Sequence, residues 1–241
     1  MPTTRANSYN SQNIAMLAAL TLIWGSSYIL IKRGLIAFSP IQLASLRISI
    51  TCLCSLPVLF RALKAVPRHK YFTLLQMGLF SSGIPAFLFA LSMTHSSSSV
   101  NGILNSLSPL WTILIGYFFY RVAITRQKVL GVVIGFLGAI VLVLGKKGGV
   151  FKFDIVYSFL PVVATFCYGL GTNITKQKLQ DENPLYCTAI AMSMIGLPAI
   201  VIAFYTEVPA VIVSGTAWVS VAAVAALSVF GTFIAWVIFY R

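Results

Sequence analysis

The sequence predicts an all-helical protein that is embedded in a membrane, and three observations carry this prediction. The chain has 241 residues, of which 59% are apolar and only 9% are charged, and its mean hydropathy is +0.92. Eight stretches come close to the length of about 20 apolar residues that a helix needs to cross a bilayer. A barrel strand would need only about 10 alternating residues, so the length of these stretches favours helices.

The eight predicted spans follow one another along the whole chain. In order, they are Asn13 to Ile31, Ile41 to Phe60, Tyr71 to Thr94, Val100 to Tyr120, Val129 to Gly145, Ile155 to Thr175, Leu185 to Tyr205 and Ala217 to Tyr240. The segment from Tyr71 to Tyr120 contains no Asp, Glu, Lys or Arg, and a polar turn at His95 to Ser99 is expected to divide it into two crossings. The first stretch has no small-residue cleavage pattern at its end, so it is expected to remain as the first span.

An internal duplication is visible in the two halves of the chain. Thr21, Gly25, Lys32, Leu35, Pro40 and Ser49 recur in the same order, 144 positions later, as Thr165, Gly169, Lys176, Leu179, Pro184 and Ser193. Five crossings separate the first span from the sixth, and an odd number of crossings makes the two copies face opposite ways. Such inverted repeats are typical of secondary transporters, whose substrate site lies near the midplane where the repeats meet.

The distribution of charge predicts an orientation and argues against one class of partner. Most Lys and Arg residues lie at the span ends that share a side with the N-terminus, which predicts a cytoplasmic N-terminus. The net charge of +13 is divided among short loops, where it meets anionic lipid, so a lipid bilayer is the expected partner and nucleic acid is not.

No cofactor or metal site is predicted. The four cysteines Cys52, Cys54, Cys167 and Cys187 all fall inside predicted spans, where they behave as small apolar residues. His69 and His95 are too isolated in the sequence to form a metal site. An intramembrane enzyme is disfavoured because no span carries an acid/base pair, a nucleophile with a histidine, or a zinc signature.

Several short motifs, taken in order, resemble the EamA family of the drug/metabolite transporter superfamily. They are Trp24-Gly25-Ser26-Ser27, Pro40 followed by Leu46-Arg47, Ile124-Thr125 ahead of the glycines Gly131, Gly135 and Gly138, and Phe230-Gly231-Thr232 followed by Ala235-Trp236. The resemblance implies ten spans in two inverted five-helix repeats, and members that mostly export amino acids or other small metabolites. Val122 departs from the family pattern, because many members carry an acidic residue there.

The resemblance also implies a division of the chain into two repeats. Residues 1–148 would hold the first repeat with five spans, and residues 149–241 the second repeat with three. The sequence stops at Arg241, where the family's eighth span ends, so the second repeat is expected to be incomplete.

Polar and aromatic side chains inside the spans are the candidates for a substrate cavity. On the fourth predicted span, Asn101, Asn105, Ser108 and Thr112 share one face of a helix, and aromatic and Thr stripes on the first and sixth spans coincide under the 144-residue shift. The predicted lining residues are Trp24, Tyr28, Asn101, Asn105, Ser108, Tyr168, Thr172 and Trp236. Interhelical hydrogen bonding explains the same stripes equally well, because one stripe can serve both purposes.

Four further residues are predicted to be structural. Arg47, the one full charge inside a span, is expected to reach back to the outer interface as an anchor rather than to contact substrate. Pro109 either breaks its helix and frees carbonyl groups for a ligand or makes a packing kink. Gly131 and Gly135, together with Gly138, give the fifth span a close-packing face, for a homodimer or, preferably, for contacts within the chain.

The sequence therefore predicts transport rather than catalysis. With no Asp or Glu inside a span, proton coupling through a carboxylate is not expected. The leading hypothesis is an exporter of small neutral or zwitterionic metabolites, such as amino acids, that works by alternating access in the plasma (inner) membrane. The alternative is an incomplete transporter that needs a partner subunit or does not transport alone.

Overall fold

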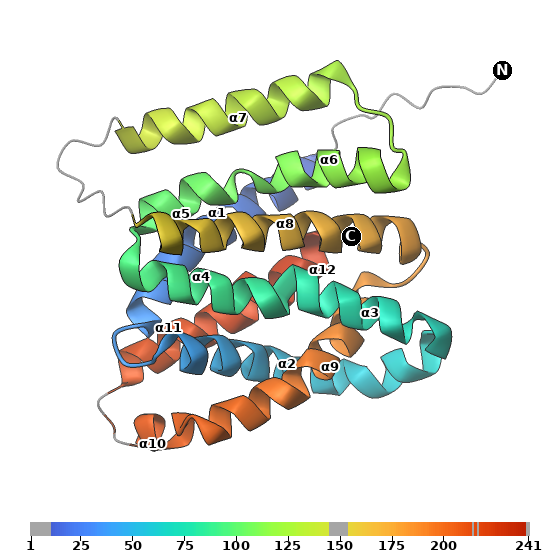
Figure 1. Cartoon of the computed structure of the whole chain (residues 1–241). Helices are drawn as coiled ribbons and strands as arrows, with labels where there is room; N and C mark the ends of the chain where they lie inside the picture. Colours follow the sequence, from blue (N-terminus) through green and yellow to red (C-terminus); the bar gives the residue numbers. More distant parts are fainter. Residues whose placement is uncertain (1–10, 145–153, 214, 216, 240–241) are drawn as a thin grey trace.

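A computed structural model describes residues 11–144, 154–213, 215 and 217–239, and every regular element in these ranges is a helix (Figure 1). In the first half these are α1 (Ser11–Gly34), α2 (Pro40–Ala65), η1 (Arg68–Lys70), α3 (Tyr71–Gly78), η2 (Leu79–Gly83), α4 (Ile84–His95), α5 (Ser98–Asn105), α6 (Ser108–Tyr120) and α7 (Arg126–Leu144). In the second half they are α8 (Ile155–Lys178), α9 (Pro184–Tyr205), α10 (Val208–Val213), α11 (Trp218–Ser228), η3 (Val229–Ile234) and α12 (Ala235–Phe239).

The helices confirm an all-α membrane protein. Seven spans in the described ranges are long and apolar enough to cross a bilayer: α1, α2, η1–α3–η2–α4, α5–α6, α8, α9 and α11–η3–α12. The remaining predicted span corresponds to the 19-residue helix α7. Large apolar side chains such as Phe60, Phe118 and Phe119 are more than two-thirds exposed, as expected for a surface that faces lipid tails.

The starts of α2 and α9 show why prolines recur in the duplicated window. Pro40 and Pro184 both occupy the first turn of a helix, where the missing N–H costs no hydrogen bond. Ser39 and Gln42 form a capping box at the start of α2, and Asn183 caps α9.

The predicted turn between the third and fourth spans is present. α4 ends at His95 and α5 begins at Ser98, after Ser97, whose Oγ accepts a hydrogen bond from the N–H of Val100. The predicted boundary between 148 and 149, Gly145 at the end of the fifth span and Tyr240 at the end of the eighth lie outside the described residues.

The helix bounds follow the 144-residue shift of the sequence. α1 and α8 coincide at their last residue under this shift, and α2 and α9 coincide at their first residue. For the helices after α10, the matching shift is 150 residues. This shift places the π-helical segment η2 on the π-helical segment η3. Each π segment interrupts its span near the middle, which is where such segments are often functional.

Three close contacts between helices repeat this correspondence. Cys52 in α2 lies against Gly196 in α9, which is its own counterpart under the shift, so closely that a Cβ on the glycine would overlap the cysteine side chain. Elsewhere a serine meets a glycine: Ser81 of η2 faces Gly171 of α8, and Gly231 of η3 faces Ser27 of α1. Ser81 corresponds to Gly231 and Ser27 to Gly171 under the shifts given above. The two contacts therefore match each other, with serine and glycine exchanged. Small residues at these crossings let the backbones approach, as is common in membrane bundles.

The core lies between α2, α4 and α9. Ala44, Ile48, Met192 and Ile195 are buried there with Ala86 and Ala199. At one end of the bundle, Lys70 of η1 forms an ion pair with Glu182 in the connection between α8 and α9. The first and second halves of the chain are therefore joined both in the core and at one surface.

Helix α7 lies apart from this core, at the edge of the bundle beyond α6 (Figure 1). Most of its described side chains are exposed. A Cβ added to Gly131, Gly135 or Gly138 would meet nothing within 4 Å. The predicted close-packing face on this helix is therefore wrong for contacts within the described chain: the glycines face open space.

Candidate functional site

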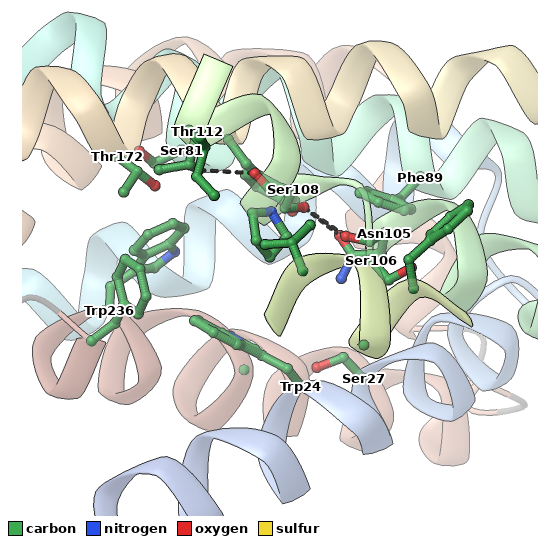
Figure 2. A pocket seen from close by; sticks show the side chains of 18 of the residues that line it. Trp24, Ser27, Ser81, Phe89, Asn105, Ser106, Ser108, Thr112, Thr172 and Trp236 are labelled. Carbon is green, nitrogen blue, oxygen red and sulfur yellow. Dashed lines mark hydrogen bonds between the residues drawn. The ribbon is translucent and has the colours of Figure 1, made fainter. Parts of the chain in front are cut away.

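A cavity of about 780 Å³ opens between α1, the α5–α6 pair, α7, α8 and the η3–α12 segment (Figure 2). Its size is within the range of small-molecule sites, and its wall is mostly apolar with a few polar groups, as is typical of such sites. It involves both halves of the chain, because helices from α1 to α7 and from α8 to α12 all contribute lining residues.

Five aromatic rings form a continuous arc along one wall of this cavity. Trp24 of α1 lies 6.2 Å from Trp236 of α12, and Trp236 lies 6.5 Å from Tyr168 of α8, measured between ring centroids. Phe89 of α4 stacks on Tyr168 at 6.0 Å, and Tyr28 of α1 meets Phe89 edge-on at 6.1 Å. Such arrangements bury large apolar areas and fix ring orientation. The arc therefore provides a preformed aromatic surface for the apolar part of a solute.

The facing wall is polar and comes from the break between α5 and α6 (Figure 2). Pro109 stands in the first turn of α6 and cannot donate to the carbonyl of Asn105. The Ser108 hydroxyl donates to that carbonyl instead, over 2.7 Å, and Thr112 donates to the Ser108 carbonyl over 2.9 Å. Of the two predicted roles of Pro109, helix interruption is the one seen, but the freed carbonyl of Asn105 is capped within the chain.

The structure brings seven of the eight predicted lining residues to this one cavity. Trp24, Tyr28, Asn105, Ser108, Tyr168, Thr172 and Trp236 all line it. Asn101 does not: its side chain is fully buried, and its amide donates to the Ser97 carbonyl over 3.0 Å. The nearest lining residue of the cavity is Asn105, one helical turn further along the chain than Asn101. The four residues predicted to be structural, Arg47, Pro109, Gly131 and Gly135, line the cavity as well.

Arg47 is placed differently from the prediction. Its Nε donates to the Thr232 hydroxyl of η3 over 2.9 Å, so the guanidinium is held within the bundle and does not extend to the outer interface. Tyr28 and Tyr168 line the same cavity as Arg47. The anchor is thus a hydroxyl of the π segment, which no helical periodicity in the sequence could have indicated.

Sequence reasoning missed several lining residues. Ser27, Ser81, Phe89, Gln127, Lys128 and Phe239 all face the cavity. Lys128, in the first turn of α7, adds a second basic residue to a cavity for which only Arg47 was expected. The motif Trp24-Gly25-Ser26-Ser27 would have indicated Ser27, because Ser27 stands one turn from Trp24 on the same helix.

No group of histidine, cysteine or carboxylate residues in the described ranges could hold a metal ion. The described lining of the cavity also includes no aspartate or glutamate. Its chemistry is therefore limited to hydrogen bonding, aromatic contact and positive charge.

A family model described as the EamA-like transporter family matches residues 12–144. A protein described as an uncharacterized transporter from Archaeoglobus fulgidus is 29% identical over 76% of this chain and 64% of its own length. A protein described as a probable amino-acid metabolite efflux pump from Salmonella typhimurium is 27% identical over 72% of this chain and 56% of its own length. The chain thus spans less than two-thirds of the length of these curated relatives.

Proposed function

Because the chain belongs to the EamA-like transporter family, we propose that it exports small zwitterionic or neutral metabolites, amino acids among them, through the aromatic cavity. Membrane transport itself follows from the family and from the named relatives, which point to a transporter rather than an enzyme. The solute class and the direction are the proposal. The single observation that carries it is a midspan cavity with an aromatic wall on one side and hydroxyl and amide groups on the other.

The two walls suit a small amphipathic solute. The arc from Trp24 to Tyr28 accepts an apolar side chain, and the rings also accept a cation over their faces. Asn105, Ser106 and Ser108 provide amide and hydroxyl groups on the opposite wall. One relative is described as a probable amino-acid metabolite efflux pump, which agrees with this solute class.

The repeated contacts support alternating access between two inverted repeats, 1–148 and 149–241. The distribution of Lys and Arg favours an N-terminus in the cytoplasm and a place in the plasma (inner) membrane. Cys52 against Gly196 pairs a residue with its own counterpart, which is the contact expected on an axis relating the two halves. Rocking of one repeat against the other about such an axis exposes a midplane site to each side in turn.

The test is efflux of amino acids from cells that express the chain. Cells are loaded with dipeptides that are cleaved inside, and the release of each amino acid is followed with time. Expression of the wild-type chain is expected to speed the release of at least one amino acid with an apolar side chain. Efflux equal to that of vector-only cells for every solute in a broad neutral and zwitterionic panel would contradict the proposal.

A matched pair of variants ties efflux to the cavity. Tyr168→Ala removes a ring from the centre of the arc and is expected to slow efflux by about two- to tenfold. Phe60→Ala removes a ring from α2 that is 76% exposed on the outer surface of the bundle and is expected to leave efflux unchanged. Equal efflux by both variants would place the solute path elsewhere.

A second candidate is a chain that transports only together with another polypeptide. The observation that favours it is the loose placement of α7, whose glycines line the cavity and meet nothing within 4 Å. Efflux in the native host combined with none from proteoliposomes that hold the purified chain alone would favour this candidate. Transport by the purified chain would exclude it.

A further inference from the structure

We propose that Arg47 is the binding site for the carboxylate of the transported solute, which deepens the proposed function above and rests on it. The inference begins with the charge distribution of the chain. Its four acidic residues are Asp154, Asp181, Glu182 and Glu207. Asp154 precedes α8, and the other three lie in the connections that flank α9, so all four are at the ends of spans. No Asp or Glu side chain therefore lies inside a span, as Arg47 does.

A charge at this depth requires a partner of opposite sign. A buried cation without one is costly, and intramembrane charges are normally paired or functional. The one hydrogen bond that the described structure gives the Arg47 side chain runs from Nε to the neutral Thr232 hydroxyl. Thr232 therefore positions the guanidinium without neutralising it.

The remaining donors suit a carboxylate. A guanidinium carries five N–H groups, and the bond from Nε to Thr232 uses one of them, which leaves the pair of terminal nitrogens. These two nitrogens match the two oxygens of a carboxylate in a bidentate pair, the strongest common arrangement for this donor. Because Arg47 is a lining residue of the cavity, a solute in the cavity can supply the carboxylate.

The surroundings favour a carboxylate that belongs to an amphipathic solute. Tyr28 and Tyr168, which line the same cavity as Arg47, are also two members of the aromatic arc. A solute whose carboxylate meets Arg47 therefore has its apolar part beside these rings. Lys128 is the other basic residue of the lining, and with no acidic residue in the described lining the cavity attracts negative groups. Neutral amines and sugars have no carboxylate that could pair with Arg47.

The test compares matched pairs of probes with the purified full chain in detergent. The probes are leucine, methionine and phenylalanine, each paired with its amide, which has the same side chain and amino group but no carboxylate. Binding is followed by calorimetry. In the wild type, at least one amino acid is expected to bind about 10- to 100-fold more tightly than its amide, as for a lost charged hydrogen-bonded pair. Equal affinity in every pair, or no binding of any amino acid, would overturn the proposal.

Variants test whether the guanidinium of Arg47 causes the preference for an amino acid over its amide. Arg47→Gln is expected to abolish the difference between amino acid and amide. Thr232→Val keeps the arginine and removes its anchor, so it is expected to weaken binding of the amino acid by about threefold or more while leaving the amide unchanged. Lys32→Gln removes one exposed charge from the end of α1 and serves as the charge-matched control with an unchanged difference. If Arg47→Gln does not fold, the wild-type ratios and Thr232→Val still decide the matter.

The efflux measurement above separates failure of this inference from failure of the proposed function. Efflux of amino acids without any preference for the carboxylate would leave the proposed function standing and remove the role of Arg47. A preference for the carboxylate in binding, without efflux, would leave the site and remove export.

Discussion

The two π segments occupy matching places in the two halves of the chain, and among the described residues the hydroxyl of Thr232 in η3 accepts a hydrogen bond from a charged side chain. Under the shifts described above, Arg47 corresponds to Ala191, and Thr232 corresponds to Ser82. At η3, the Arg47 guanidinium donates to the Thr232 hydroxyl. At η2, the Ser82 hydroxyl is buried without a hydrogen-bond partner among the described residues, and the counterpart of the arginine is the buried Ala191.

This difference distinguishes the backbone arrangement, which the duplication repeats, from the chemistry of the site, which it does not repeat. The backbone arrangement recurs in both halves, including the interrupted span and the exchanged serine and glycine contacts. The chemistry does not recur, because one charge and one hydrogen bond are present at the crossing of α2 with η3 and not at the matching crossing of α9 with η2. A buried hydroxyl without a hydrogen-bond partner, such as that of Ser82, is unfavourable. We attribute its presence to the duplication, because Ser82 is the counterpart of Thr232.

The largest expected effect comes from breaking the hydrogen bond between Arg47 and Thr232. Thr232→Val keeps the shape of the side chain but leaves the Nε of Arg47 without an acceptor. Loss of a hydrogen bond to a charged group costs about 2 kcal/mol. The free energy of unfolding, measured by titration of mixed micelles with SDS, should fall by this amount. A variant as stable as the wild type would show that Thr232 does not anchor the guanidinium.

The next largest effect is expected at the tighter of the two serine–glycine contacts. In Gly171→Ala, the new Cβ would overlap the Ser81 hydroxyl and lie 3.1 Å from the Ser81 backbone nitrogen. Backbone cannot yield as a side chain does, so α8 and η2 must separate, at a cost of about 1–3 kcal/mol. The same SDS titration measures this loss, and an unchanged free energy of unfolding would contradict the close approach.

A smaller effect is expected at the matching contact. In Gly231→Ala, the new Cβ would lie 3.1 Å from the Ser27 hydroxyl and from a methyl group of Leu227, both of which are side-chain ends. These groups can shift by a few tenths of an ångström, so the loss should stay below about 1 kcal/mol. The prediction to check is the order: Gly231→Ala must destabilise less than Gly171→Ala. As a control, Gly135→Ala on α7 meets nothing within 4 Å and should not destabilise the protein.

The smallest effect is expected at the uncharged crossing, where η2 carries Ser82. Ser82→Ala removes a buried hydroxyl that has no partner, so the free energy of unfolding should be unchanged or should rise by up to about 1 kcal/mol. Compared with Thr232→Val in the same titration, this variant isolates the contribution of Arg47. A clear destabilisation would reveal an unrecognised partner of Ser82 and would weaken the contrast between η2 and η3.

The span pattern and most of the cavity were predictable from the sequence, for a physical reason. Span length and the aromatic stripes of α1 and α8 depend on regular helical spacing, and Trp24, Tyr28 and Tyr168 indeed lie in one cavity. The placement of Arg47 was not predictable, because its acceptor Thr232 lies 185 residues away on a π segment. Gly131 and Gly135 were misjudged because glycines spaced for packing look the same whether or not a neighbouring helix is present.

Each π segment also sets the rotational phase of the helix that follows it. Phe89 and Trp236 both lie beyond such a segment, in α4 and α12. A π turn holds one residue more than an α turn, so closing η2 or η3 into a regular α-helix with every residue retained would turn everything beyond it by about 100°. Phe89 would then rotate away from Tyr168, or Trp236 away from Trp24. A single-codon deletion within either segment is therefore expected to be tolerated better than one elsewhere in the same span, because it removes the extra residue and keeps the rings beyond it in phase.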